Sequence, residues 1–186
     1  MPRVGLDFNT ILMTAVEIAD HEGVEAITLA TIARKLSVKP PSLFNHMSGL
    51  PSIKRAMSLY GLSLLYEKMN NAIKEKENDE ALFSMATAYL EFTREHPGLY
   101  QFTIRAPEKD DQELEIASNK LLQLISEVLC KYNIAEEMII HKIRGLRSIL
   151  HGFASLEQMG AFGLPVRTEE SFEHLVSSYI NSLKLG

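Results

Sequence analysis

The sequence predicts an all-α fold with two domains, and three observations support this prediction. Apolar residues recur through nearly the whole chain at a spacing of about 3.6 residues, which places them on one face of a helix. No segment shows a convincing alternation of apolar and polar residues that would indicate a strand. The chain has 186 residues, 46% of them hydrophobic, which is enough to bury a sizeable core.

The composition predicts a soluble protein of the cytoplasm. The single cysteine, Cys130, excludes an internal disulfide framework and fits a reducing compartment. Every apolar run is shorter than the roughly 18 residues of a membrane-spanning helix. Because Asp7 precedes any apolar core, the start of the chain does not resemble a signal peptide. No membrane partner is expected.

The first two predicted helices each have a start signal. Asp7 can cap the first helix and Gly23 can end it, whereas Thr28 can cap the second. The inward residues predicted for the first helix are Ile11, Leu12, Ala15, Ile18 and Ala19. Those predicted for the second helix are Leu29, Ile32, Ala33 and Leu36.

Residues 28–47 have the dimensions of a helix-turn-helix, with a three-residue turn at 37–39 and a second helix that opens at Pro40. Ala33 is small where the two helices must cross, and Val38 is an apolar residue in the turn. In such a motif the N-terminal end of the second helix can enter a major groove about 12 Å wide. The inward residues of this helix are Leu43 and Met47, and the outward residues are Pro41, Ser42, Phe44 and Asn45. Other corners between two helices bury residues at similar spacing.

The central part of the chain reads as longer helices. A fourth helix begins near Pro51, and the polar run 74–80 ends it as a solvated linker. A fifth helix covers about 80–95, Pro97 opens a short piece, and a polar loop at 105–111 precedes the next helix. The inward stripes of these three helices are Ile53, Met57, Tyr60 and Leu64; then Leu82, Met85, Tyr89 and Phe92; then Leu114, Ala117, Leu121, Ile125 and Val128.

The last two helices each carry a large apolar stripe. From Glu136 to about Met159 the stripe is Ile139, Ile143, Leu146, Leu150 and Phe153, and small residues gather on roughly the opposite side at Gly145, Ser148, Gly152 and Ser155. The final helix, capped at Thr168, has the stripe Phe172, Leu175, Val176, Tyr179 and Leu183. Pairing of both helices with their copies would make a four-helix bundle between subunits. Alternatively, both helices complete the core of a monomer.

The charge of the chain is unevenly distributed. Residues 1–60 carry six basic and five acidic side chains, whereas residues 61–186 carry thirteen and nineteen. The stretch from Ala26 to Tyr66 contains only basic charged residues, namely Arg34, Lys35, Lys39, Lys54 and Arg55. A polyanion could therefore dock on this stretch while the acidic remainder faces away. A chance gap in acidic residues would give the same pattern.

Residues 8–58 resemble the N-terminal domain of TetR-family transcriptional regulators. The likeness rests on the opening helix, on Ile32-Ala-Arg-Lys-Leu36, and on Pro40-Pro-Ser-Leu-Phe-Asn-His46, which runs straight into a fourth helix. The remainder is similar to the TetR-type C-terminal domain of the WHG-containing group, through Thr93-Arg-Glu-His-Pro-Gly-Leu-Tyr100, Leu150-His-Gly-Phe-Ala-Ser-Leu-Glu157, Gly163-Leu-Pro165 and Glu170-Ser-Phe172. The resemblance implies a helix-turn-helix DNA-binding domain over 1–48 and an α-helical ligand-binding and dimerisation domain over 49–186.

The resemblance places Ser42, Phe44 and His46 at the DNA. The position of Phe44 is usually a tyrosine that contacts a phosphate, so Phe44 is expected to contact a thymine methyl group or a sugar instead. Leu50 stands where many members carry a lysine, so the phosphate contact there is expected from the helix N-terminus or from Lys54. Lys39 replaces a common Ser or Thr cap and adds a cation that can reach a phosphate. The candidate DNA-binding residues are Thr28, Arg34, Lys39, Pro41, Ser42, Phe44, Asn45, His46 and Lys54.

A ligand pocket among helices five to eight is also implied by the resemblance. The candidate ligand-binding residues are Met85, Tyr89, Phe92, Tyr100, Phe102 and His151, because apolar ligands are bound mainly by aromatic and aliphatic side chains. An aromatic stripe at helical spacing is more often plain core than a ligand site, so it is the resemblance that predicts the pocket. His151 lies on one helical strip with Arg144 and Arg147, and for it a structural hydrogen bond between helices is favoured over a ligand contact.

Catalytic and metal-binding patterns are missing from the sequence. The six histidines never fall three or four residues apart, and one cysteine is too few for a thiolate metal site. The chain has no Gly-rich phosphate loop and no serine nucleophile elbow. His46 could in principle be a general base, but beside Asn45 at the end of a recognition helix a backbone or phosphate contact is the better interpretation. No cofactor and no catalytic residue are therefore expected.

These observations together predict a homodimeric regulator that binds a double-stranded DNA operator and responds to a small-molecule effector. A repressor that its effector releases from the operator is expected. Two alternatives stay open: a helical small-molecule-binding protein or enzyme without DNA binding, and an architectural DNA-binding dimer without a ligand.

Overall fold

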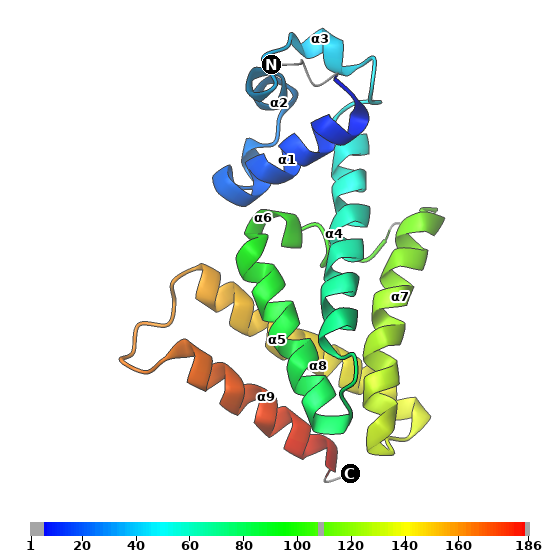
Figure 1. The fold of residues 1–186 in the computed structure, drawn as a ribbon, viewed down its shortest axis with the longest axis vertical. Helices are drawn as coiled ribbons and strands as arrows, with labels where there is room; N and C mark the ends of the chain where they lie inside the picture. The colour runs from blue at the N-terminus through cyan, green and yellow to red at the C-terminus, as the bar shows by residue number, and fades with distance from the viewer. Residues whose placement is uncertain (1–5, 108–109, 185–186) are drawn as a thin grey trace. The chain divides into compact units, whose positions relative to one another are not determined.

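The protein is all-α, as predicted. The computed structural model describes residues 6–107 and 110–184, and within them every regular element is helical (Figure 1). In chain order the elements are α1 (Phe8–Glu22), η1 (Val24–Ala26), α2 (Leu29–Lys35), α3 (Pro40–Leu43), α4 (Leu50–Ala72), α5 (Asn78–Glu95), α6 (Pro97–Tyr100), α7 (Gln112–Leu129), η2 (Cys130–Tyr132), α8 (Glu136–Gln158) and α9 (Thr168–Lys184). Of the helices in these ranges, none has the length and apolar character needed to cross a membrane.

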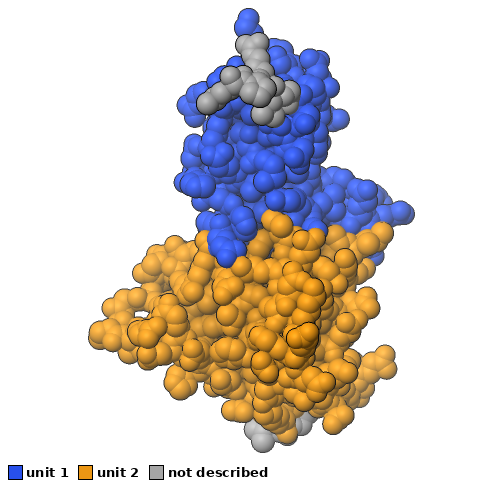
Figure 2. Space-filling view, in the orientation of Figure 1, with its two compact units in different colours: residues 1–63, 95–115 blue, residues 64–94, 116–186 orange. Residues whose placement is uncertain are grey.

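The chain divides into two compact units, each made of two stretches of sequence (Figure 2). The first unit contains residues 1–63 and 95–115, and the second contains 64–94 and 116–186. The predicted boundary between residues 48 and 49 separates two expected functions, whereas the compact units are defined by which residues pack against each other. The difference arises because the first part of α4 and all of α6 join the helix-turn-helix region in one unit.

In the first unit, α1 begins, ends and packs as its sequence predicts. The Asp7 carboxylate accepts a hydrogen bond from the backbone N–H of Thr10 at 2.7 Å and caps the helix. This bond also holds the pKa of Asp7 below its ordinary value. Gly23, with φ at +89°, ends the helix in a conformation that favours glycine. The predicted inward stripe is buried, at Ile11, Leu12, Ala15, Ile18 and Ala19.

Asp20 anchors the end of α1 to α6. Its side chain is only 9% exposed, and its carboxylate accepts hydrogen bonds from the backbone N–H groups of Gly98 at 2.9 Å and Leu99 at 2.8 Å. Nδ1 of His96 lies 2.9 Å from the same carboxylate. A side chain on Gly98 would not fit, because a Cβ atom there would overlap the carbonyl group of Ala19. The carboxylate thus satisfies N–H groups that have no partner inside α6.

In the second unit, α8 and α9 bury most of the stripes predicted for them. The α8 residues Ile139, Ile143, Leu146, Leu150 and Phe153 are all buried, as are Phe172, Val176 and Leu183 of α9. Tyr179 is half-buried, and its hydroxyl donates a hydrogen bond to the carbonyl oxygen of Lys142 at 2.6 Å, which joins α9 to α8. Burial raises the pKa of Tyr179 to about 12.

Several predicted boundaries shift by a few residues. The α5 helix begins at Asn78, so the end of the predicted linker is helical. Thr168 is the first residue of α9 and not its cap. Residues 108 and 109 of the loop predicted over 105–111 lie outside the described residues. Helix ends vary because the last turn is held by few hydrogen bonds.

Candidate nucleic-acid interface

Backbone hydrogen bonds define the turn between α2 and α3. The N–H of Ser37 donates to the carbonyl of Arg34 at 3.1 Å, and the N–H of Val38 donates to the carbonyl of Ala33 at 2.9 Å. Ser37 has φ at +56°, in the left-handed region. This combination is a Schellman motif, which satisfies carbonyl groups at the end of a helix. The predicted short connection is therefore a defined turn that sets where α3 starts.

The α3 helix is shorter than the sequence predicts. It covers Pro40–Leu43, and residues 44–46 continue as a turn. The N–H of Phe44 donates to the carbonyl of Pro41 at 3.3 Å, so the chain tightens to 3₁₀ geometry and the α-helix ends. Lys39 occupies the N-cap position without a side-chain hydrogen bond, consistent with its replacement of the usual Ser or Thr.

The candidate DNA-binding side chains lie on or beside this motif, and all but Ser42 are exposed. Phe44 is 56% exposed, a high value for an aromatic ring, while Leu43 and Met47 are buried. Ser42 is half-buried. The other exposed candidates are Thr28, Arg34, Lys39, Pro41, Asn45, His46 and Lys54. The Thr28 hydroxyl also caps α2, since it accepts a hydrogen bond from the N–H of Thr31 at 3.0 Å.

The five basic residues of the acid-poor stretch fall into two groups. Lys35 pairs with Glu17 of α1 at 2.9 Å, and Arg55 pairs with Asp111 and Glu113. By contrast, Arg34, Lys39 and Lys54 form no ion pair with any residue of the described chain. These three cations are consequently the ones available to phosphate groups.

Arg55 is held firmly by the start of α7. Its Nε and Nη2 atoms donate to the two carboxylate oxygens of Asp111 at 2.6 and 2.7 Å, and Nη2 also donates to Glu113 at 2.6 Å. The hydrogen bonds from Arg55 lower the pKa of Asp111, which stays ionised. Asp111 also caps α7 through the N–H of Leu114 at 3.2 Å. The same carboxylate therefore orders α7 and removes one cation from the basic stretch.

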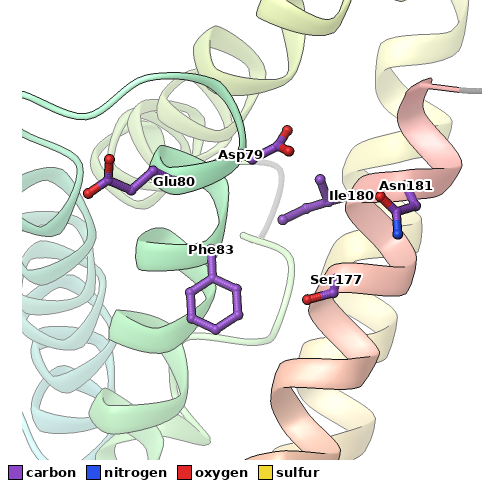
Figure 3. A pocket seen from close by; sticks show the side chains of 6 residues that line it. All are labelled: Asp79, Glu80, Phe83, Ser177, Ile180 and Asn181. Carbon is purple, nitrogen blue, oxygen red and sulfur yellow. The ribbon is translucent and has the colours of Figure 1, made fainter.

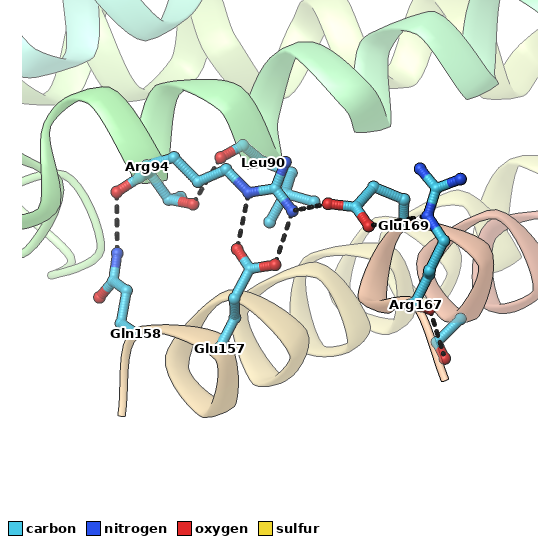
Figure 4. A network of polar contacts seen from close by, with 8 residues as sticks. Leu90, Arg94, Glu157, Gln158, Arg167 and Glu169 are labelled. Carbon is cyan, nitrogen blue, oxygen red and sulfur yellow. Dashed lines mark hydrogen bonds and ion pairs between the residues drawn. The ribbon is translucent and has the colours of Figure 1, made fainter. Parts of the chain in front are cut away.

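Arg94 and Glu157 were not among the predicted functional residues, although both lie in segments that carry the family resemblance. Arg94 donates from Nε and Nη2 to Glu157 at 2.7 and 2.6 Å, and its Nη2 lies 3.8 Å from Glu169 (Figure 4). Gln158 donates to the carbonyl oxygen of Thr93 at 2.9 Å. These contacts tie the end of α5 to the end of α8 and the start of α9. The only sequence signal for this ion pair was the presence of a basic residue in one resemblance motif and an acidic residue in another.

The predicted ligand-binding residues are divided between the two units. Met85, Tyr89 and Phe92 lie on α5 in the second unit and are buried. Tyr100 of α6, also buried, and the half-buried Phe102 belong to the first unit. His151 is exposed on α8, with its ring nitrogens 3.5 Å from the Ser155 hydroxyl on the same helix. The structure thus groups three of the six candidates on one helix.

The face of α8 opposite its buried stripe has space at Gly152 and is covered by α9 at Gly145. A Cβ atom on Gly152 would meet nothing within 4 Å, whereas one on Gly145 would lie 3.6 Å from the ring of Tyr179. Large apolar side chains are exposed on α8 and in the loop that follows it, at Met138, Ile140, Leu156, Met159, Phe162, Leu164 and Val166. Exposed apolar residues in such number are typical of a protein interface.

Metal-ligating side chains do not gather anywhere in the described ranges, where no three His, Cys, Asp or Glu residues are placed to hold an ion.

Comparison with known proteins finds the same architecture. Residues 82–179 match the family of tetracyclin repressor-like C-terminal domains. The chain is 37% identical over 186 residues to the uncharacterized HTH-type transcriptional regulator YobS of Bacillus subtilis, covering 100% of this chain and 96% of that protein.

Two solved structures share the fold at low sequence identity. The transcriptional regulator SCO7222, a TetR from Streptomyces coelicolor, has a TM-score of 0.75 and 13% identity, with 97% of this chain and 99% of that chain covered. A TetR variant from Acinetobacter baumannii AYE, in complex with minocycline, has a TM-score of 0.71 and 16% identity, with 97% of each chain covered.

Proposed function

Because the chain belongs to the TetR family of DNA-binding transcriptional regulators, we propose that it is a homodimeric repressor that a small-molecule effector releases from its operator in the cytoplasm. The observation that carries this proposal is the exposed helix-turn-helix surface, on which Arg34, Lys39 and Lys54 lack an ion-pair partner among the described residues. The family consists of regulators and not of enzymes, so the alternative of an enzyme that lacks DNA binding is set aside.

The proposed DNA contacts divide into two kinds. Lys39 and Lys54, with Arg34, neutralise phosphates and position the protein on the duplex. Ser42 and Asn45 can read base edges in the major groove, and the exposed ring of Phe44 can contact a thymine methyl group or a sugar. Thr28, Pro41 and His46 border this surface and are proposed to contact the backbone. In this proposal neutral residues read the bases directly, while cations supply most of the affinity.

The proposed dimer forms through α8 and α9. The small residues of α8 allow a partner helix to approach closely, and the exposed apolar residues at the end of α8 would be buried by it. A two-fold dimer places two recognition elements at grooves one helical turn apart, roughly 34–36 Å. The operator is therefore expected to be a palindrome with that half-site spacing.

The proposed effector site uses Met85, Tyr89 and Phe92 of α5. All three side chains are buried, so an effector must open space beside α5 to reach them. Contacts of the effector with Tyr100, Phe102 and His151 remain predictions. A ligand that prefers the dimer with separated recognition helices would lower DNA affinity by its differential binding to the two states. A relative with this fold was crystallised with minocycline, a small molecule.

Selection from a random pool of duplex DNA, at low and near-physiological salt, tests the proposal. We expect a palindromic motif that persists at the higher salt, because base contacts add to the phosphate term. Variants Ser42→Ala and Asn45→Ala should change the selected motif. Binding that is independent of sequence and lost with salt would support the architectural alternative instead. No retention at either salt would contradict a regulator that binds DNA without its effector.

The dimer interface is tested by Gly152→Leu. A Cβ atom at Gly152 would meet nothing within 4 Å in the single chain, so we expect the fold to be unchanged while the paired helices are pushed apart. Sedimentation should then show monomers with an unaltered circular dichroism spectrum. A variant that sediments as a dimer would show that this face of α8 does not pair.

A further inference from the structure

A cleft lies within the second unit, between the start of α5 and the end of α9. Its volume is about 340 Å³, and its lining residues are Asp79, Glu80, Phe83, Ser177, Ile180 and Asn181. Figure 3 shows the side chains of Asp79 and Ile180 turned toward the space between the two helices, with Phe83 further along α5. None of the six predicted ligand-binding residues lines this cleft, so it is a site separate from the proposed effector site.

The cleft combines an apolar wall with polar groups. Phe83 and Ile180 supply an aromatic ring and an aliphatic side chain. Ser177 and Asn181 are exposed on α9, and neither side chain has a hydrogen-bond partner within the described part of the protein. A ligand could therefore use their donors and acceptors without breaking an existing bond.

Asp79 already holds an ammonium group at one end of the cleft. One of its carboxylate oxygens accepts a hydrogen bond from the Tyr132 hydroxyl at 3.1 Å, and the other accepts one from the ammonium group of Lys184. The Lys184 hydrogen bond is the main cause of the lowered pKa of Asp79, which is ionised. The Lys184 side chain is 50% exposed and lies near the end of α9, so water competes with this ion pair.

We propose that this cleft binds a small organic ammonium compound, whose charged group replaces that of Lys184 on Asp79. The apolar body of the ligand packs against Phe83 and Ile180. An aromatic ring close to a carboxylate favours a cation, because the face of the ring is negative. The volume of the cleft is near the small end of the range for ligand sites, which favours a compact amine.

Titration of the full chain with 2-phenylethylammonium chloride, without DNA, tests the proposal by calorimetry or by ligand-observed NMR. We expect saturable binding that is at least about tenfold tighter than that of the neutral 2-phenylethanol, because only the amine replaces the charged hydrogen bond. The anion phenylacetate should not bind. Equal affinity for the amine and the alcohol would show a merely apolar groove and would overturn the proposal.

Variants of the two halves of the ion pair should have opposite effects. Asp79→Asn should weaken binding of the amine by about tenfold or more, whereas Lys184→Ala should tighten it, because the competing ammonium group is gone. Partial unfolding could explain a loss of binding but not a gain. Phe83→Ala should also weaken binding. Glu67→Gln, which removes an exposed carboxylate of α4 outside the cleft, is the matched control and should leave the affinity unchanged.

A lack of saturable binding by both the unmodified protein and Lys184→Ala would overturn the proposal, as would an Asp79→Asn variant with unchanged affinity. Operator selection uses no amine and the titration uses no DNA. Failure of this proposal is therefore distinguishable from failure of the proposed regulatory function.

Discussion

The helix-turn-helix surface of the first unit and the α5–α8–α9 framework of the second unit use their cations differently. At the surface, Arg34, Lys39 and Lys54 are exposed and have no ion-pair partner in the described chain. In the framework, Arg94 is held by two hydrogen bonds to Glu157. Elsewhere in the second unit, Lys68 of α4 lies 3.4 Å from Glu91 of α5. The difference separates cations that join helices from cations that we propose to bind DNA.

The first unit contains both kinds of cation side by side in the sequence. Lys35 follows Arg34 and Arg55 follows Lys54, yet Lys35 and Arg55 are bound to carboxylates while their neighbours are not. A helix turns by about 100° per residue, so adjacent side chains face different surroundings. The density of basic residues along the sequence therefore overstates the number of cations left for DNA.

The largest expected effect comes from removing the three unpartnered cations together. The triple variant Arg34→Ala, Lys39→Ala, Lys54→Ala should lose at least about a hundredfold in DNA affinity, and its salt dependence should flatten by about 0.9 per lost phosphate contact. Its unfolding temperature should not fall, because no ion pair is broken. Fluorescence anisotropy over a salt series measures both the affinity and its salt dependence.

A matched control for that variant removes the same charge elsewhere. The triple variant Lys74→Ala, Lys76→Ala, Lys131→Ala changes exposed lysines of the second unit and should leave the salt dependence unaltered. Equal losses of DNA affinity in the two triple variants would mean that net charge alone drives binding. Arg34, Lys39 and Lys54 would then have no special role at the DNA.

The next largest effect is expected at the anchor between α1 and α6. Asp20→Ala removes a nearly buried carboxylate and leaves the N–H groups of Gly98 and Leu99 without their acceptor, which should cost about 2–3 kcal/mol of stability. Asp20→Asn keeps an acceptor oxygen and should lose less. Chemical denaturation of both variants tests this order, and equal losses would contradict the role given to the two backbone hydrogen bonds.

Arg94→Ala should destabilise the protein by about 1–2 kcal/mol, because it leaves the largely buried carboxylate of Glu157 without its partner. The salt dependence of DNA binding should stay the same. Arg167→Ala is the control, since Arg167 is 73% exposed and its carboxylate partners lie 3.8 and 4.0 Å away. Equal unfolding free energies for the two variants would show that Arg94 does not stabilise the packing of α5, α8 and α9.

The smallest effect is expected from the partnered cations of the first unit. Lys35→Ala and Arg55→Ala should each change the salt dependence of DNA binding by much less than Lys54→Ala, because Glu17 and Asp111 already neutralise these side chains. Anisotropy titrations of the three single variants allow a direct comparison. A slope for Arg55→Ala that matches that of Lys54→Ala would show that DNA displaces Asp111 from Arg55.

Local patterns in the sequence predicted the helices well. Apolar spacing identified the buried faces of α1, α8 and α9, and Asp7 and Gly23 marked the ends of α1 correctly. These features depend on residues within one or two turns of each other, so the sequence contains the whole cause. The start of α3 at Pro40 was predicted, but its early end at Leu43 was not, because hydrogen bonds of the last turn decide between α and 3₁₀ geometry.

Patterns along the chain were therefore sufficient to predict the all-α fold, the helix-turn-helix spacing and the family resemblance. Tertiary structure decided which cations are partnered and how the chain divides into units. Arg55 and Asp111 are 56 residues apart in the chain, and Asp20 and Gly98 are 78 apart. Spacing along one helix encodes the direction in which a side chain points. Which residue that side chain contacts depends on how two helices that are distant in the sequence pack together.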